Sequence, residues 1–156
     1  MKHTRLLVFL GMLTLQNSQA WSHESVLSSR GQIIYVPSYT ELYRYGDMKA
    51  DAVSTVNIHN IDLKFSIKVT SVKGYDTSGQ LVKNYLDKPL VLGPLASKSF
   101  VASYQKNSDG TGSNFIIKWE SDHVVVAPLI ESFLVASTGN HGFSHSSKGR
   151  VVEELK

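Results

Sequence analysis

Apolar and polar residues alternate along much of this chain, which is the pattern of β-strands with one buried face and one wet face. The clearest run covers residues 63–70, where apolar side chains at odd positions alternate with polar ones at even positions in the sequence LKFSIKVT. In residues 114–120, Phe115, Ile117 and Trp119 fall on one face by the same rule. We therefore expect a strand in each segment, with these apolar residues in the core.

More strands are expected wherever β-branched and aromatic residues gather between turn residues. They cover residues 32–36, 53–59, 72–76, 80–85, 97–105 and 148–153. Asn60-Ile61-Asp62 is short enough for a turn or a tight corner, and Thr77-Ser78-Gly79 is typical of a hairpin. Residues 88–94 contain two prolines and a glycine, which suits a sheet edge or a crossover between sheets.

Residues 128–137 (PLIESFLVAS) fit two descriptions, because their apolar residues can form one helical stripe or one strand face. The neighbouring strands and the β-branched content favour a strand. The count is then seven or eight strands, with no helix expected. This pattern predicts an all-β fold, a single immunoglobulin/fibronectin-like antiparallel β-sandwich over residues 32–153, with a short tail at 154–156.

The first twenty residues have the composition of a secretory signal peptide. Lys2 and Arg5 give a positive start, residues 6–15 form a short apolar block, and Ser18-Gln19-Ala20 offers small residues for cleavage. The block is shorter than the roughly 20 residues that span a bilayer. We therefore expect a signal peptide at residues 1–20, a flexible leader at 21–31, and an exported protein, periplasmic or secreted, with no membrane span after cleavage.

Composition narrows the compartment and the partners. The sequence contains no cysteine, so neither a disulfide nor a cysteine-linked lipid anchor can form. Because small animal extracellular domains usually carry disulfides, a bacterial periplasm is favoured. Removing Lys2 and Arg5 from the 16 basic residues leaves 14 against 13 acidic ones, a net charge of +1. With no run of like charges, a nucleic-acid partner gains no support.

His141 and His145 are the candidate metal ligands, with zinc or copper as the ion. Their four-residue spacing would align them on a helix, but the glycines and serines of GNHGFSHSS predict a loop over residues 138–147. Such a loop can still wrap a metal ion, with Asp122 or Glu131 completing the ligand set. A solvated polar loop is the simpler interpretation.

One fragment resembles an enzyme motif and another resembles a calcium site, and each lacks a residue that its motif requires. Ser144 in GFSHS is one residue short of the G-x-S-x-G elbow, which also needs a strand-to-helix turn. Asp109 lies in a glycine loop that resembles part of a calcium site, but Lys118 stands where the distal glutamate belongs. No closely spaced carboxylate pair or phosphate-cradling loop is present, so the balance leans away from an enzyme.

Tyrosines supply the candidate partner-binding surface. Tyr39, Tyr43 and Tyr45 cluster in a segment expected to be irregular or at a sheet edge, and aromatic residues with a polar tip are enriched at recognition surfaces. Arg150 is a charged residue inside an otherwise apolar strand, as is Glu131. The two either face water, pair with each other or line a cleft, and the sequence leaves all three open.

Three stretches carry a resemblance to a known family: residues 74–101 (GYDTSGQLVKNYLDKPLVLGPLASKSFV), residues 110–121 (GTGSNFIIKWES), and Gly142-Phe143-Ser144 with Lys148-Gly149-Arg150-Val151. They resemble an uncharacterised exported bacterial family, catalogued as domain of unknown function number three thousand one hundred and twenty-four. The resemblance runs from about Tyr35 to Val152. It implies a small exported bacterial β domain and no particular substrate.

Together these features predict a non-enzymatic protein-binding or assembly module of the cell envelope. The expected contact surfaces are the loop at 138–147 and the tyrosine cluster at 39–45. The alternative is a carrier of a metal or small ligand that uses His141 and His145. The sequence does not identify the partner protein or the small ligand in either case.

Overall fold

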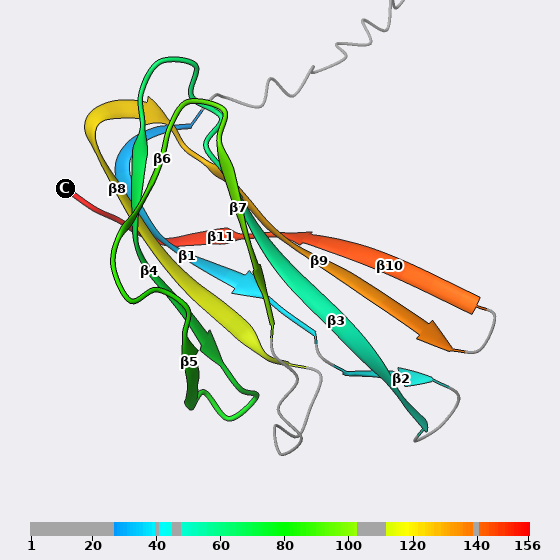
Figure 1. The fold of residues 1–156 in the computed structure, drawn as a ribbon. Helices are drawn as coiled ribbons and strands as arrows, with labels where there is room; N and C mark the ends of the chain where they lie inside the picture. The colour runs from blue at the N-terminus through cyan, green and yellow to red at the C-terminus, as the bar shows by residue number, and fades with distance from the viewer. Residues whose placement is uncertain (1–26, 40, 45–47, 103–111, 139–140) are drawn as a thin grey trace, which may run out of the picture.

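The computed structural model of the protein describes residues 27–39, 41–44, 48–102, 112–138 and 141–156, which form eleven β-strands and no helix (Figure 1). In chain order the strands are β1 (Ser28–Pro37), β2 (Glu41–Arg44), β3 (Met48–His59), β4 (Ile67–Tyr75), β5 (Leu81–Asn84), β6 (Leu90–Leu92), β7 (Ser97–Val101), β8 (Asn114–Val126), β9 (Leu129–Thr138), β10 (His141–Lys148) and β11 (Arg150–Glu154). The all-β prediction is confirmed. In the described part of the chain, no helix is long and apolar enough to cross a membrane.

The strands build two antiparallel sheets. The first has the order β11-β1-β8-β4-β5, with β6 also paired to β4. The second has the order β10-β9-β3-β2, with β7 paired to the other half of β3. In Figure 1, β3, β9 and β10 run together toward the lower right, while β4 and β8 run in the other layer. Each sheet therefore combines strands from the two ends of the chain with strands from its middle.

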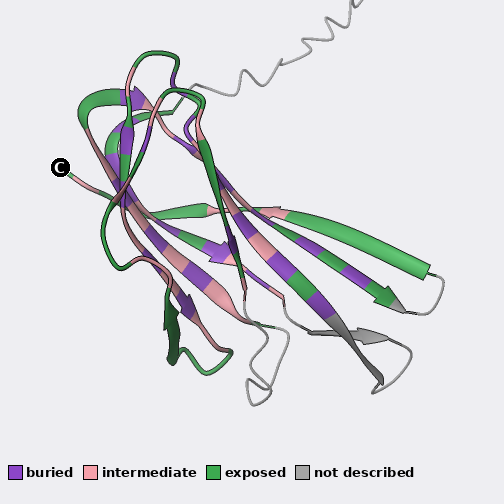
Figure 2. Ribbon diagram, in the orientation of Figure 1, coloured by how far each residue is buried: buried purple, intermediate pink, exposed green. Residues whose placement is uncertain are grey.

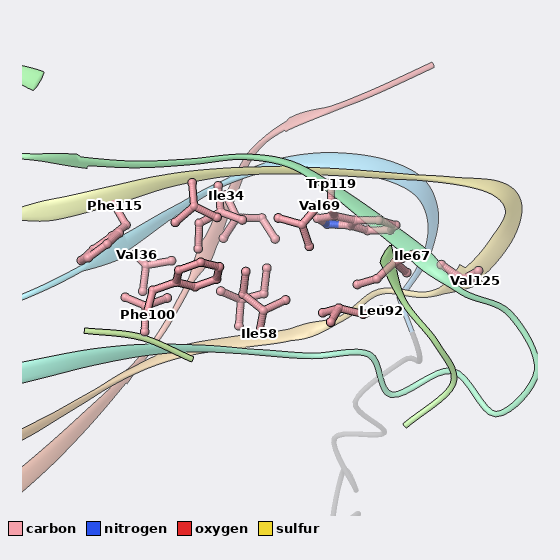
Figure 3. Close-up of a cluster of buried hydrophobic side chains, with 14 residues drawn as sticks. Ile34, Val36, Ile58, Ile67, Val69, Leu92, Phe100, Phe115, Trp119 and Val125 are labelled. Carbon is pink, nitrogen blue, oxygen red and sulfur yellow. The ribbon is translucent and has the colours of Figure 1, made fainter. Parts of the chain in front are cut away.

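The core lies between these two layers (Figure 3). Phe115, Ile117 and Trp119 of β8 are buried on one face, as the alternation predicts. Val56 and Ile58 of β3 close the core from the second sheet and are 0% exposed. Full burial of an apolar side chain of this size stabilises the fold by about 1.5–3 kcal/mol. In the absence of cysteine, this layer of side chains holds the two sheets together, and strand pairing holds each sheet.

A smaller apolar cluster lies beyond the main core. It contains Ala52 of β3 with Leu134 and Ala136 of β9, and the partly buried Tyr39 packs against it. Figure 2 shows the alternation of buried and less buried residues continuing along β9. The second sheet therefore has its own small inner cluster near β2, separate from the one under Trp119.

The strand expected at residues 63–70 begins four residues later than the alternation predicts. β4 starts at Ile67, and Leu63 is 75% exposed. Residues 60–66 instead form the corner that carries the chain from the second sheet to the first. Their backbone N–H and C=O groups are bound by the side chains of Asn60 and Asp62, which offer the backbone a partner other than a strand.

The loop expected at residues 138–147 is wrong for most of its length. Residues 141–148 form β10, which pairs with β9 from His141 opposite Thr138 to Lys148 opposite Glu131. Pairing with β9 holds this glycine- and serine-rich segment as a strand and satisfies the backbone groups on one side of it, although its own propensity favours a loop. The ambiguous segment at 128–137 is a strand, β9.

At the other end of the chain, β1 begins at Ser28, within the stretch expected to be a flexible leader.

Candidate functional site

The β10 edge is the outermost strand of the second sheet. Within the described residues, β10 pairs with β9 alone, and the register runs without a bulge. Every residue of β10 except Ser147 is exposed (Figure 2). The edge contains no proline, and its only full charge is Lys148 at the end. Alternate residues of an edge strand direct their N–H and C=O groups away from the sheet, so β10 presents a row of groups able to pair with another strand.

An exposed apolar patch lies beside this edge on the outer face of the second sheet. We call it the outer patch and define it as Val53, Val101, Phe133 and Val135, which are 55%, 54%, 43% and 49% exposed. Val53 stands opposite Val135, and both Phe133 and Val101 stand opposite Thr55. Directly opposed residues share a face, so the patch spans β7, β3 and β9. Contiguous exposed apolar surface of this kind marks interaction sites.

A second feature is a cleft of about 490 Å³ at the other end of β10. It lies between the start of β1, the β8–β9 connection and the β10–β11 turn. Most of its lining is apolar: Leu27, Ile34, Ile61, Val126, Ala127, Pro128, Leu129, Ile130, Gly149 and Val151, with Gln32 and Lys148 as the polar members. Small-molecule pockets in proteins have this size and this mostly apolar lining with few polar groups.

Gln32 is a polar side chain at a core-facing position of β1 and is 2% exposed. Its Nε2 donates a hydrogen bond to Glu154 Oε1 at 2.6 Å. Glu154 Oε2 in turn accepts from Ser29 Oγ at 2.6 Å. Gln32 Oε1 is buried and has no donor among the described residues. Trp119 lies directly opposite Gln32 on β8, and its buried Nε1 likewise has no acceptor in the described part of the chain.

The residues expected to form one partner-binding surface lie in different parts of the structure. Tyr39 is partly buried against the small inner cluster. Tyr43 lies on β2, where its backbone pairs opposite Lys49. Tyr45 lies outside the described residues. Arg150 is on β11, exposed and opposite Tyr35 of β1, so it belongs to the first sheet rather than to the tyrosine segment.

His141 and His145 lie on the same strand and the same face of β10, and both are exposed. Four residues of strand separate them by roughly 13 Å. Two imidazoles bound to one zinc ion must place their nitrogens about 2 Å from the metal. The structure therefore does not bring this pair together at one ion. Across the described ranges, no group of three or more His, Cys, Asp or Glu side chains is arranged to hold a metal.

Glu131 and Asp122, the residues expected to complete a metal site, lie in different sheets. Asp122 is on β8, and Glu131 is on β9 opposite both Asn57 and Lys148. Within the described residues no ion pair joins Glu131 to Arg150, which the sequence left open. The structure therefore does not bring the two acidic residues together at one site.

Sequence reasoning missed both the β10 edge and the Gln32 cleft. The sequence does contain a signal for the cleft. Gln32, Ile34 and Val36 occupy alternate positions of one strand, so they share a face, and Gln32 is predicted to be a polar group facing the core. Its partner, Glu154, falls in the tail expected at residues 154–156. The edge had no comparable signal, because its glycines and serines are typical of a loop.

Comparison with known proteins gives a family and no activity. A family model described as "Protein of unknown function (DUF3124)" matches residues 31–152. No curated protein has a sequence significantly similar to this chain. A crystal structure of Thermotoga maritima 1070 is similar with a TM-score of 0.44 and 15% identity, over 80% of this chain and 97% of that chain. A likeness at this level supports no conclusion about fold or function.

Proposed function

The chain belongs to the DUF3124 family, and we propose that it is a non-enzymatic protein-binding module that accepts an extended segment of a partner at the β10 edge. The observation that carries the proposal is the unguarded edge itself. Proteins usually protect long edge strands with lysines inside the strand, proline or a bulge. β10 has none of these between His141 and Ser147.

Strand addition also specifies the chemistry of the partner. Main-chain hydrogen bonds to β10 give affinity, and alternate side chains of the added segment give specificity. On the outer face the added segment lies next to Ser144 and Ser146, which stand opposite Val135 and Phe133. Small or apolar side chains fit this side, because the outer patch continues the same face. The preferred partner is therefore an extended segment of low charge with small and apolar residues at alternate positions.

The setting we propose is the bacterial cell envelope. The positive start, the short apolar block and the small residues before Trp21 favour export to the periplasm or the exterior. An exported binding or assembly module meets partner segments before they fold or insert, which suits strand addition. The metal-carrier alternative has less support, because the strand spacing of His141 and His145 works against a shared ion.

We also propose that the fold is a variant of the immunoglobulin-type sandwich. In that fold the second strand lies between the first and the fifth, and the sixth lies between the third and the last. Here β3 lies between β9 and β7, and β8 lies between β1 and β4. Support for the proposal comes from this shared central pairing. In the variant, β9 and β1 have exchanged the places of the first and last strands.

A displayed library of extended peptides tests the proposed function. Peptides are selected on the purified protein and then measured against two double variants. One, Ser144→Lys with Ser146→Lys, guards the edge; the other, Ser78→Lys with Gln80→Lys, adds the same charge at an exposed turn. We expect selected peptides to lose at least about ten-fold in affinity for the guarded edge only, as the edge-lysine effect predicts.

Hydrogen exchange gives the second readout of the same experiment. A bound peptide should slow exchange of alternate β10 amides, which otherwise face solvent. Peptides that bind equally to both variants, or that leave β10 exchange unchanged, would show that the edge is not the binding site.

A further inference from the structure

β10 itself meets the description of the segment that fits its edge. Between His141 and Ser147 it contains no lysine, arginine, aspartate or glutamate. Gly142, Ser144 and Ser146 provide small side chains at alternate positions of the outer face. The chain therefore carries a strand of low charge and small size that can pair with its own edge in a second copy.

The inner face of β10 also lacks a cover. Phe143 stands opposite Ala136, which is buried, and yet Phe143 itself is 42% exposed. His145, two residues further along the same face, is exposed as well. In the part of the chain that the structure describes, no strand lies beyond β10, which is at the outer margin of the molecule (Figure 1). A strand added at β10 would bring side chains next to both rings and cover apolar surface that a single copy leaves in water.

Symmetry limits the register of a pair of β10 strands. Two identical strands that pair antiparallel are related by a two-fold axis perpendicular to the sheet, so each residue stands opposite one on the same face. The uncharged stretch of residues 141–147 has Ser144 at its centre. An axis at Ser144 pairs the whole stretch with itself and leaves Lys148 outside. An axis at Phe143 would shorten the paired stretch, and an axis at His145 would bring Lys148 into it.

The register centred on Ser144 gives compatible neighbours on both faces. On the inner face, Phe143 of each copy stands opposite His145 of the other, and cross-strand pairs of rings stabilise a sheet. On the outer face, Ser144 stands opposite its own counterpart and Gly142 stands opposite Ser146. No two charged side chains and no two large side chains meet on that face.

We infer, given strand addition at β10, that the protein forms a symmetric dimer in which the β10 strands of two copies pair antiparallel about Ser144. The second sheets then join into one continuous sheet with the order β2-β3-β9-β10-β10-β9-β3-β2. A two-fold contact is closed, so both β10 edges are covered at once and this contact stops at two copies. A foreign segment has to displace the second copy before it can bind at this edge.

Single introduced thiols test the register, because the chain has no cysteine of its own. Directly opposed residues of paired strands have Cα atoms about 4.5–5.5 Å apart, within the range that a disulfide spans. We expect Ser144→Cys to form a covalent dimer when the oxidant diamide is added, since the two thiols meet at the axis. Ser146→Cys is the matched control on the same face, because its two copies lie four residues apart along the sheet, roughly 13 Å. It should cross-link at least about ten-fold more slowly.

Sedimentation velocity measures the pairing without a cross-link. We expect dimers of the unmodified protein to appear as its concentration rises to about 1 mM, where even weak association is visible. Ser144→Lys places two like charges opposite each other at the axis and should weaken the dimer at least about five-fold. Ser78→Lys adds the same charge at an exposed turn and should leave the dimer unchanged.

Three outcomes would overturn the dimer: a monomer at every concentration, equal cross-linking of Ser144→Cys and Ser146→Cys, or a dimer that Ser144→Lys leaves intact. The selected peptides judge strand addition separately. Peptides that slow β10 exchange on a protein that stays monomeric would support strand addition and refute self-pairing. Peptides that bind without dissociating a dimer paired through Ser144 would leave self-pairing in place and show that foreign segments bind elsewhere.

Discussion

Asn60 and Asp62 together hold the corner between the two sheets. The backbone N–H of Asp62 donates to Asn60 Oδ1 at 3.1 Å. Asn60 Nδ2 donates to the carbonyl oxygens of Phe65, Leu92 and Gly93 at 2.9, 3.1 and 2.9 Å. Asn60 is 1% exposed, so water cannot replace these partners. One side chain thus ties the end of β3 to the corner loop and to the end of β6.

The first prediction is that Asn60→Ala lowers the free energy of unfolding by about 3 kcal/mol. Several backbone groups lose their partner at once, and each unsatisfied buried group costs on the order of 1–3 kcal/mol. Urea unfolding followed by circular dichroism measures the change. Asn57→Ala is the matched control on β3, the strand that ends just before Asn60, because the bond between Asn57 and Ser99 is exposed. An equal loss in both variants would contradict the role of Asn60.

The second prediction concerns acid. Hydrogen bonds from the backbone N–H groups of Lys64, Phe65 and Val126 lower the pKa of Asp62 below its ordinary value. A carboxyl group with a lower pKa in the folded state stabilises the fold above its unfolded pKa, and this contribution is lost as the pH falls through the folded value. The stability supplied by Asp62 is therefore full at neutral pH, begins to decline near the ordinary carboxyl pKa of about 4, and is lost as the pH falls further through the lower pKa of the folded state.

The matching variant is Asp62→Asn, measured by urea unfolding across the same pH range. It replaces the carboxylate oxygen that accepts from the Val126 N–H at 2.9 Å. We expect it to be less stable than the unmodified protein at pH 7 and to approach it in acid. A stability difference that stays constant from pH 7 to pH 3 would argue against the linkage.

The sequence predicts correctly the strands whose apolar and polar residues alternate regularly. The prediction fails where side chains, instead of a neighbouring strand, bind the backbone N–H and C=O groups. Phe115, Ile117 and Trp119 are in the core as expected, because burial of one face is a local property of β8. Leu63 follows the same alternation and yet is exposed, because Asn60 and Asp62 bind the backbone of the corner. That outcome depends on Leu92 and Gly93, about thirty residues away, which periodicity does not reveal.

The Gln32 cleft and the β10 edge were predictable to different degrees, because each depends in part on residues that are distant in the sequence. The core-facing position of Gln32 predicts a buried polar group. Its partner Glu154 is not predictable in the same way, because it comes from the far end of the chain. β10 could not be predicted, because its strand conformation depends on pairing with β9 rather than on its own residues. The four-residue spacing of His141 and His145 would bring the two side chains together on a helix but holds them apart on a strand. Only the structure shows that the segment is a strand.

The third prediction rests on a close approach of two strands. A Cβ atom added at Gly31 of β1 would lie 2.8 Å from the carbonyl oxygen of Trp119. Backbone cannot move aside as a flexible side chain can, so we expect Gly31→Ala to lower the free energy of unfolding by about 1–3 kcal/mol. Gly93→Ala is the control, because nothing lies within 4 Å of its added Cβ. Thermal or urea unfolding that ranks the two variants in the opposite order would contradict this account.

The fourth prediction concerns the carboxylate that orients Gln32. Glu154 accepts from both Gln32 and Ser29, each at 2.6 Å. A glutamine at this position has a single acceptor oxygen, so it can keep the bond from Gln32 but not the one from Ser29, whose O–H is left with the Gly31 carbonyl oxygen at 3.0 Å. We expect Glu154→Gln to lower the free energy of unfolding by about 1 kcal/mol, the typical net contribution of one hydrogen bond.

Glu153→Gln provides the comparison for this fourth prediction. Glu153 is the preceding residue of β11 and stands opposite Ile33, so its side chain lies on the other face of the sheet. Removing its charge should change stability by less than about 0.5 kcal/mol, as for most surface substitutions. Urea unfolding of both variants at neutral pH separates the hydrogen-bonding role of Glu154 from a general effect of charge on β11. If the two variants lose the same stability, Glu154 does not hold the Gln32 carboxamide in place.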